Sequence, residues 1–346
     1  MAISLSDSDL ADLQKNPHVA MVSPDYEVSM LGKNSGDVSA QAQTLPTGIN
    51  RTDAELNLTN KGSGIGVAVI DTGINLTHPD LGSVISGANC VTKKRNASPN
   101  DDNGHGSHVA GTIAARDNGI GVVGVAPLSN LIAVKVLNAQ GSGTWSSVIC
   151  GIDWVTANAV KYNIKVANMS LGGGGSSDNN CGNSNSDALH KAICRSTVAG
   201  VTYVVAAGNS GVNAALSVPA AYDDTVITVS ALADSDGLSG GLGAATAYGA
   251  DDTFASFSNF GSVVDIGAPG VNIYSTWKNG GYSTISGTSM ASPHIAGAAA
   301  LYVKSNPGAS WTTVRDGLKA VGELPGAGHT DPSGNHPEPV VKAAGL

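Results

Sequence analysis

Charged residues are scarce in this sequence, and basic residues never gather into a stripe. Only 13% of the 346 residues are charged, about half of the usual fraction of roughly 25%. The net charge is -9, and basic residues are adjacent only at Lys93, Lys94 and Arg95. Because a protein needs a row of basic groups to neutralise phosphates, we exclude nucleic acid as a partner. The triplet is interpreted as part of a solvated loop.

Long apolar runs are also missing. The longest, from Ile295 to Val303, stops at Lys304 and is far short of the roughly 20 residues that a membrane span needs. We therefore expect neither a membrane span nor a membrane partner. Neither heptads nor a Gly-X-Y repeat appears, which excludes coiled coils and collagen. The 41% of hydrophobic residues excludes a disordered acidic chain, so the composition is that of a globular protein.

The four cysteines form no Cys-x-x-Cys pair, which argues against zinc. An even number permits full pairing, and free buried thiols are the alternative. If they pair, the short separation of Cys181 and Cys194 favours that bridge, which leaves Cys90 with Cys150. Paired cysteines would indicate an oxidising compartment.

The first 41 residues differ from the rest, because they carry -4 of the net charge and only 2 of the 45 glycines. They begin without the basic and apolar regions of a signal peptide, and we expect a truncated start. Ser6 or Ser8 predicts the cap of a helix that runs through Gln14, and residues 18–30 predict an extended stretch. So short a piece rarely folds alone, so it should dock on the rest, with 32–41 as an exposed linker.

From residue 42 onward, short β-branched runs alternate with longer helical patterns, which predicts a parallel sheet covered by helices on both faces. No linker divides residues 42–346, so we expect one large α/β domain. The expected strands are 66–70, 130–136, 166–169, 202–206 and 226–229, and the expected helices are 105–116, 144–162, 186–200 and 289–305.

In such sheets, functional groups lie beyond the carboxyl ends of the strands, and three residues are candidates for this position. Asp71 follows an apolar strand in VAVIDTGI, His105 stands in GHGSHVAG and Ser289 in SGTSMASPH. Each residue also has a purely structural interpretation: Asp71 as a loop cap, His105 as a structural histidine and Ser289 as a helix N-cap. His105 and His108 lack the HExxH pattern of zinc proteases. Together, however, the three supply a carboxylate, a general base and a nucleophile.

The three motifs resemble the signatures of the subtilisin-like serine proteases, or subtilases, over essentially all of residues 42–346. Their chain order, Asp, His and Ser, is that of subtilisin. The resemblance implies a three-layer α/β fold with about seven parallel strands, and peptide hydrolysis as the reaction. It also implies that Ser289 is the nucleophile, His105 the general base and acid, and Asp71 the group that orients the imidazole. Asn209 in VVAAGNSG matches the family's oxyanion-hole residue, against the alternative of a turn residue.

The resemblance also implies a substrate cleft between two chain segments. Substrate would lie extended beside Ser170–Gly173 and pair as an added strand, with Ala206–Gly208 as the other wall. Ser217 at the pocket base is small and uncharged, so we expect large apolar residues at P1. Trp145 matches the aromatic lid of the S4 pocket, or it simply packs at a helix start. The implied cleft residues are Ser170, Leu171, Gly172, Gly173, Ala206, Ala207, Gly208, Ser217 and Trp145.

Calcium is the cofactor that the resemblance implies, held by oxygen ligands. The family's tight site matches the side chains of Gln43, Asp80 and Asn118 and the carbonyls of Arg116, Ile120 and Val122. A weaker site would use Asp265 with carbonyls of Asp224 and Val226. The carboxylates from Asp234 to Asp252 give a third candidate, against the simpler interpretation that they are solvated.

The stretch from Ala42 to Gly48 matches a mature subtilisin N-terminus, which implies cleavage near Gln41–Ala42. Residues 1–41 then resemble the last part of an inhibitory propeptide, and 42–346 the peptidase. We expect a secreted, monomeric endopeptidase whose partners are protein or peptide substrates and its own propeptide. Two alternatives stay open: an intracellular subtilisin, and a latent form whose cleft is filled by residues 36–41.

Overall fold

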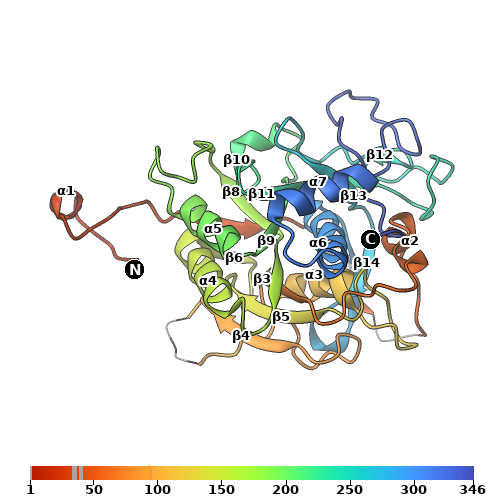
Figure 1. The fold of residues 1–346 in the computed structure, drawn as a ribbon, viewed down its shortest axis with the longest axis horizontal. Helices are drawn as coiled ribbons and strands as arrows, with labels where there is room; N and C mark the ends of the chain where they lie inside the picture. Colours follow the sequence, from red (N-terminus) through yellow and green to blue (C-terminus); the bar gives the residue numbers. More distant parts are fainter. Residues whose placement is uncertain (1, 33–36, 39–41, 93, 95) are drawn as a thin grey trace.

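The computed structural model describes residues 2–32, 37–38, 42–92, 94 and 96–346. Lys93 and Arg95 of the basic triplet therefore lie outside the described residues, as does most of the expected linker. The chain folds into three layers around a twisted central sheet (Figure 1).

The central sheet has the order β12-β11-β9-β7-β3-β5-β4, and β13 also pairs with β11. Within the described residues, seven of these strands run parallel, and only the short β12 is antiparallel to its neighbour. The prediction of about seven parallel strands is confirmed. The strands are β3 (Gly66–Asp71), β4 (Ile85–Asn89), β5 (Asn130–Lys135), β7 (Ile164–Met169), β9 (Thr202–Ala206), β11 (Val226–Ala233), β12 (Thr253–Phe254) and β13 (Ile266–Pro269).

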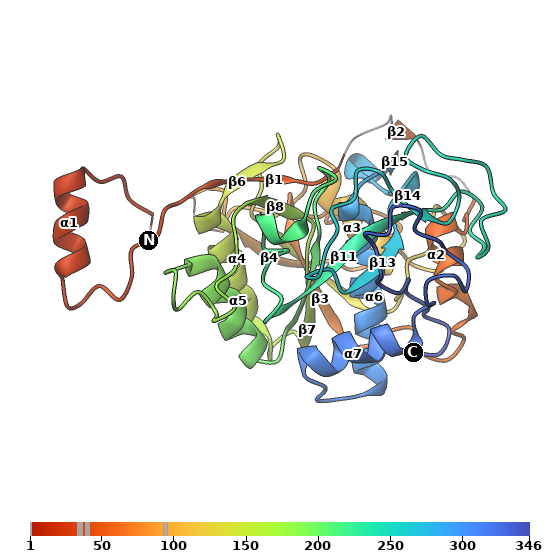
Figure 2. The ribbon, with the colours of Figure 1, turned by 90° about the horizontal axis from the view of Figure 1, so that it is seen from above.

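Helices cover both faces of this sheet, because side chains of a strand alternate between the faces. In β3, Val67 and Val69 belong to the apolar core shared with α3 and α6, whereas Ala68 and Ile70 belong to the core shared with α4 and α5. Figure 2 shows the two helix layers on opposite sides. The helices are α2 (Thr47–Arg51), α3 (His105–Ala114), α4 (Trp145–Asn158), α5 (Ala188–Val198), α6 (Thr288–Ser305) and α7 (Trp311–Val321).

Two smaller sheets flank the central one. The first has the order β10-β8-β1-β6, with β1 from the amino-terminal segment, and the second has the order β14-β15-β2. Their bounds are β1 (Glu27–Met30), β2 (Asp37–Val38), β6 (Ser142–Thr144), β8 (Leu171–Gly174), β10 (Ser217–Val218), β14 (Ile273–Thr276) and β15 (Tyr282–Ile285).

The amino-terminal segment docks through its strand and not through its helix. Helix α1 (Asp7–Lys15) is capped by Ser6 as predicted, but it buries no residue and lies away from the body of the molecule (Figures 1 and 2). Strand β1, in contrast, pairs antiparallel with both β6 and β8. The expected docking is thus made by β1 and, later in the segment, by β2, which pairs with β15.

Both predicted disulfides are present. Cys90 is bonded to Cys150 and Cys181 to Cys194, and no cysteine is free among the described residues. The first bridge ties the end of β4 to α4, and the second ties a loop to α5. The alternative of free buried thiols is therefore excluded.

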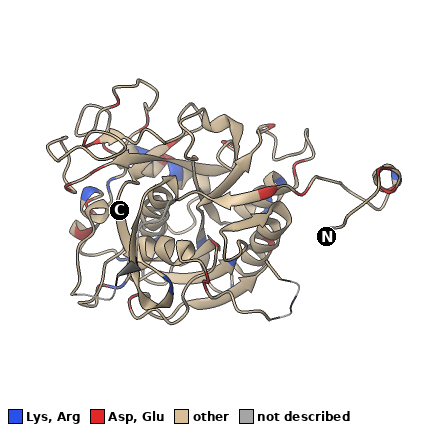
Figure 3. Ribbon diagram, turned by 180° about the vertical axis from the view of Figure 1, so that it is seen from behind, with Lys and Arg blue, Asp and Glu red and all other residues tan. Residues whose placement is uncertain are grey.

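Figure 3 shows how the charged residues are distributed along the fold. In the part of the chain that is described, Lys and Arg are scattered over many elements in the view of Figure 3. A search of the described helices also finds none that is long and apolar enough to cross a membrane.

Candidate active site

The three residues that the motifs singled out meet at the carboxyl edge of the central sheet. Asp71 is the last residue of β3, His105 is the first residue of α3, and Ser289 lies in the first turn of α6. All three are fully buried. Asp71 thus stands at the carboxyl edge of the parallel sheet, and the starts of α3 and α6 bring His105 and Ser289 to the same edge.

Asp71 and His105 form a direct pair. The Oδ1 atom of Asp71 lies 2.8 Å from Nδ1 of His105 and also accepts the backbone N–H of Thr72 at 2.7 Å. A carboxylate on Nδ1 fixes the imidazole so that Nδ1 carries the proton and Nε2 is left to act as a base. Within the described residues, Nε2 has no hydrogen-bond partner.

Ser289 points toward a carbonyl in this structure. Its Oγ donates to the carbonyl of Ser170 at 3.0 Å, and within the described residues no hydrogen bond joins it to His105. Catalytic hydrogen bonds commonly tighten only during the reaction. In this conformation the hydroxyl of Ser289 is therefore engaged by Ser170 and not by His105.

Asn209, in the loop that follows β9, is the next candidate residue of the site. Its Oδ1 accepts the N–H of Thr288 at 2.9 Å and the hydroxyl of Thr288 at 2.8 Å. Because a backbone N–H can only donate, this contact fixes which end of the amide faces Thr288. The Nδ2 group consequently donates to the carbonyl oxygen of Leu31 at 2.7 Å.

Two glycines, Gly287 and Gly32, show how tightly the peptide bond after Leu31 is enclosed. A Cβ atom placed on Gly287 would lie 2.4 Å from the oxygen of Leu31 and 3.1 Å from Nδ2 of Asn209. A Cβ atom placed on Gly32 would lie 3.2 Å from Nε2 of His105. The Leu31–Gly32 peptide bond therefore passes between the amide of Asn209 and the imidazole of His105.

The chain leading to Leu31 lies in the cleft as an extended strand. Ser29 and Met30 of β1 pair with Gly172 and Leu171, and the N–H of Leu31 donates to Ser170 at 3.3 Å. The expectation that residues 36–41 fill the cleft is therefore wrong. Residues 27–31 fill it, whereas Asp37–Val38 pair with β15, and residues 36 and 39–41 lie outside the described residues.

A cavity of about 270 Å³ opens beside Leu31. It is uncharged, and Asn209 and Asn259 provide polar amides in its lining. Asn259 holds one wall, since its Nδ2 donates to the carbonyl of Ala207 at 3.0 Å. The expected cleft residues in the lining are Gly172, Gly173, Ala206, Ala207, Gly208 and Ser217, and the additional ones include Leu31, Gly174, Val218, Ala220 and Asn259.

Trp145 lies at the other end of the bound strand. It belongs to the same apolar cluster as Val28 and Leu171, and a Cβ atom placed on Gly173 would lie 3.0 Å from its ring. Val28 is only 1% exposed, three residues before Leu31. The structure thus places Trp145 in a buried apolar cluster together with a residue of β1, and its role at the S4 pocket stays a prediction.

Asp101 is a positioning residue that the sequence analysis missed. Its Oδ1 accepts the hydroxyl of Thr72 at 2.9 Å, and its Oδ2 accepts the N–H of Ser107 at 2.9 Å. Thr72 in turn accepts the N–H of Gly106 at 2.9 Å. These bonds fasten the start of α3 to the end of β3, and so fix His105 against Asp71. A carboxylate just before the helix start was the available signal.

The residues expected to hold the first calcium ion come together. Oδ2 of Asp80 accepts the N–H of Val122 at 2.9 Å, and Oε1 of Gln43 accepts the N–H of Asn118 at 2.9 Å. Asp80 is fully buried and its Oδ1 has no partner among the described residues. Burial raises the pKa of Asp80. An orphaned buried oxygen beside carbonyls and amides fits a hard cation. The loop contributes Arg116, Asn118, Ile120 and Val122.

Asp265, the residue expected at a weaker calcium site, faces two side-chain cations of α7. Its Oδ1 lies 3.8 Å from Nε of Arg315 and 3.6 Å from Nζ of Lys319, and its Oδ2 accepts the N–H of Thr228 at 3.0 Å. Neighbouring cations weaken the attraction of a carboxylate for a further cation. A calcium ion at Asp265 stays a prediction.

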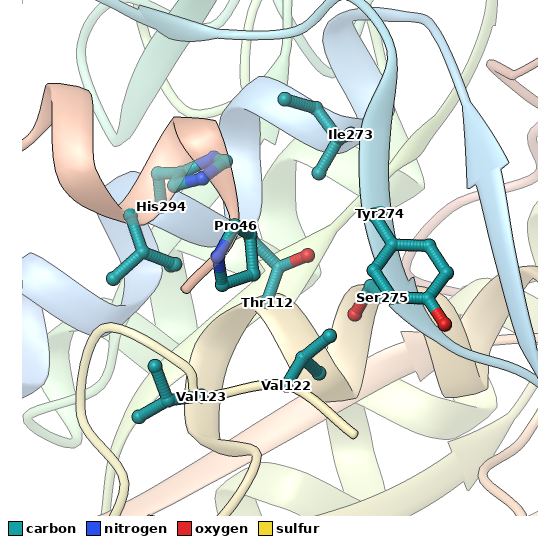
Figure 4. A pocket seen from close by; sticks show the side chains of 9 residues that line it. Pro46, Thr112, Val122, Val123, Ile273, Tyr274, Ser275 and His294 are labelled. Carbon is teal, nitrogen blue, oxygen red and sulfur yellow. The ribbon is translucent and has the colours of Figure 1, made fainter. Parts of the chain in front are cut away.

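A second hollow lies between α2, α3, β14 and α6. Figure 4 shows the side chains that surround it, including Pro46, Thr112, Ile273 and His294. It is too narrow to admit a water molecule. We therefore interpret it as a small gap in the packing of these elements and not as a ligand site.

The three-layer fold, and a carboxylate paired with the imidazole of His105 at the carboxyl edge of the sheet, are typical of serine hydrolases. The model of the subtilase family (Peptidase_S8) matches residues 62–321, and the chain belongs to this family as a serine endopeptidase. It is 41% identical to an alkaline protease of Shouchella clausii over 324 residues, which are 92% of this chain and 73% of that protein.

Two further comparisons agree. The chain is 44% identical to Subtilisin Savinase of Lederbergia lenta over 283 residues, which are 80% of this chain and 91% of that protein. The crystal structure of a cold adapted subtilisin-like serine proteinase matches with a TM-score of 0.69 and 36% identity, covering 86% of this chain and 97% of that one.

Proposed function

We propose that this protein is a secreted, calcium-stabilised endopeptidase that cleaves after large apolar residues and first cleaves its own chain at Leu31–Gly32. The observation that carries the proposal is the seating of Leu31, whose carbonyl oxygen lies 2.7 Å from Nδ2 of Asn209. The segment around it pairs as a substrate strand would.

Ser289 attacks the carbonyl carbon of the scissile bond in this proposal. A serine hydroxyl is a poor nucleophile at neutral pH, so it needs His105 to take its proton. His105 later donates that proton to the leaving amine, and Asp71 stabilises the imidazolium that exists between the two transfers. The contact of Asp71 with Nδ1 at 2.8 Å supports this division of roles.

Asn209 stabilises the charge that develops on the carbonyl oxygen. Thr288 holds its amide so that Nδ2 faces the oxygen before the reaction begins. A hydrogen-bond donor that is already oriented stabilises the transition state more than one that must first rotate, because folding has already fixed its position. The N–H of Ser289 at the helix start is the expected second donor.

The preference for apolar residues rests on the bound strand. Leu31 lines the uncharged cavity beside Ser217, so P1 leucine is accommodated without a buried charge. Val28 occupies the position of P4 and packs in the cluster that contains Trp145. We therefore expect efficient substrates to carry apolar residues at both P1 and P4.

The position of Leu31 changes the expected course of maturation. Because Leu31–Gly32 is the bond between Asn209 and His105, it is the bond proposed for the first, intramolecular cut. The boundary expected near Gln41–Ala42 then requires a second cut in the exposed linker. The uncut chain described by the structure corresponds to the latent form.

Mass spectrometry tests this proposal. The intact protein should release a peptide of residues 1–31, and Ser289→Ala should prevent the release. Leu31→Asp should slow it strongly, because the cavity offers no cation. Leu5→Asp is the matched control, since Leu5 is 38% exposed and outside the cleft. Release of residues 1–41 as the only first product would contradict the first cut at Leu31.

Secretion is supported by the two disulfides, which form and persist in oxidising compartments. The intracellular alternative predicts reduced thiols in the cell. Recovery of the protein from the culture medium of its host with both bridges formed would decide between the two locations.

The proposed calcium ion would be held by Gln43, Asp80, Asn118 and the carbonyls of the 116–122 loop. When bound, it would neutralise the buried carboxylate of Asp80 and tie the loop to β15 through Tyr282, whose hydroxyl donates to Asp80 at 3.2 Å. A chelator should lower the melting temperature of the Ser289→Ala protein. Asp80→Asn should remove most of that response, and an unchanged melting temperature in chelator would contradict the assignment.

A further inference from the structure

The loop between β11 and β12 contains several acidic residues that lie outside the candidate active site. Asp234 directly follows β11, and Asp251 directly precedes the pair Asp252 and Thr253. The antiparallel pairing of Ala233 with Thr253 brings the two ends of this loop together. The sheet itself, and not loop geometry alone, therefore holds the carboxylates of Asp234 and Asp251 near each other.

We propose that Asp234, Asp236 and Asp251 form a second cation site, which binds calcium. Their carboxylate oxygens lie within 4.8 Å of one another. Calcium binds oxygen at about 2.3–2.6 Å, so two oxygens on opposite sides of one ion stand roughly 5 Å apart. The three groups are thus spaced as ligands of a single ion.

Asp234 supplies the independent reason to expect a ligand. It is only 2% exposed, and its Oδ1 accepts the N–H of Gly237 at 3.0 Å. Its Oδ2 is buried and has no partner among the described residues. A buried carboxylate oxygen without a donor is costly, and a cation between the three carboxylates removes that cost.

The surrounding hydrogen bonds prepare the other ligands. Asp251 accepts the N–H of Ser235 at 2.8 Å through one oxygen and the N–H of Gly243 at 2.7 Å through the other. Asp236 accepts the N–H of Leu238 at 2.8 Å. Oδ1 of Asp251 also accepts the hydroxyl of Ser235 at 3.0 Å, so Oδ2 of Asp251 is the oxygen that retains a lone pair for an ion, as do the oxygens of Asp236.

Other charges nearby do not neutralise the group. Arg51 is a side-chain cation whose charge acts on Asp234, and it is shared by Asp252 and Glu323 at 2.6 Å each. Asp252 further accepts the N–H groups of Gly240 and Gly241 through its other oxygen. Arg51 lowers the charge felt by Asp234, but three carboxylates remain with no direct ion pair.

The chemistry of the donors selects calcium. Zinc prefers nitrogen and sulfur ligands, and no histidine or cysteine belongs to this group. Magnesium demands near-ideal octahedral geometry and keeps its waters, whereas calcium accepts six to eight oxygens in irregular loops. An ion here would link the ends of β11 and β12 to the exposed chain around Leu238 and Leu242, which are 60% and 90% exposed.

The experiment counts bound calcium in the full chain with Ser289→Ala, which prevents self-digestion and needs no activity. Equilibrium dialysis after removal of metal should show one calcium fewer for Asp236→Asn and for Asp251→Asn than for the parent. Asp236 is the safer variant, because it is not part of the buried core. Asp153→Asn, an exposed acid on α4, is the control and should retain the full count.

A second measurement locates the ion. Calcium should protect the bonds at Leu238 and Leu242 from an added protease, and Asp251→Asn should abolish this protection while Asp80→Asn leaves it intact. If Asp236→Asn and Asp251→Asn both bind as many calcium ions as the parent and keep its protection from protease, the proposal is overturned. Loss of calcium in Asp80→Asn alone would equally overturn it. Neither outcome bears on the proposed catalysis.

Discussion

Nδ2 of Asn209 lies 2.7 Å from the carbonyl oxygen of Leu31, while Oδ1 of the same amide accepts the N–H of Thr288. Replacement of Asn209 by leucine keeps the volume but removes the donor. We expect kcat to fall by about 10² to 10³, or roughly 2.7–4 kcal/mol, a magnitude known from subtilisin itself. KM should change little, because the donor acts mainly on the transition state.

Steady-state kinetics on a peptide with leucine at P1 check this expectation. Asn306→Leu, at the exposed end of α6, is the control. A drop that appears only in KM would show that Asn209 binds substrate and does not stabilise the oxyanion.

Gly287 leaves room for the carbonyl oxygen. Since a Cβ atom there would lie 2.4 Å from the oxygen of Leu31, Gly287→Ala should displace the scissile carbonyl from Asn209. We expect a loss of kcat/KM on the order of 10²-fold or more, similar to the loss of the donor itself. The melting temperature should change much less than the activity. Gly345→Ala, where a Cβ atom meets open space, should leave both unchanged.

Two buried histidines predict the response of stability to acid. Burial lowers the pKa of His108 to about 3 and that of His294 to about 4, from ordinary values of 6.5. The unfolded chain therefore binds more protons below pH 6.5. Stability is fully present above that pH and is lost as the pH falls toward the folded values, at about 1.4 kcal/mol per pH unit for each group.

Urea unfolding of the Ser289→Ala protein at several pH values measures this slope. His294→Gln should flatten it between pH 6.5 and 4, whereas His18→Gln, at an exposed position, should not. A slope that is identical in all three proteins would show that other groups control the acid response.

The two disulfides should differ in their contribution to stability. Cys90 and Cys150 are separated by 60 residues, and Cys181 and Cys194 by 13. In the chain-entropy model, closing these loops stabilises the fold by about 4 and about 3 kcal/mol respectively. The double variant Cys90→Ala and Cys150→Ala should therefore lose more free energy of unfolding than the variant of the other pair. The reverse order would mean that loop length does not decide the effect.

Much of the site was predictable because its residues stand at the boundaries of regular elements. Asp71 ends a strand and His105 begins a helix, and both boundaries are marked by the change from apolar runs to glycine and polar residues. The parallel sheet then brings such boundaries to one edge. The motifs around these residues carried the family resemblance as well.

The contacts that were not predicted join distant segments through tertiary packing. Nothing local to Leu31 shows that β1 lies between β6 and β8, since pairing depends on which edges the folded domain leaves open. The amide of Asn209 is oriented by Thr288, 79 positions later in the chain. Helix α7 places Arg315 and Lys319 beside Asp265, which no pattern local to Asp265 indicates.

If the proposed cut after Leu31 occurs, the separation of α1 from the body limits how strongly residues 1–31 can inhibit afterwards. While the chain is intact, β1 competes for the cleft as a tethered segment, at an effective concentration far above that of any free peptide. A cut after Leu31 removes the tether, and α1 adds no buried contact to replace it. Peptide 1–31 is then an ordinary product held by one strand, so dilution should release it, and activation should be difficult to reverse.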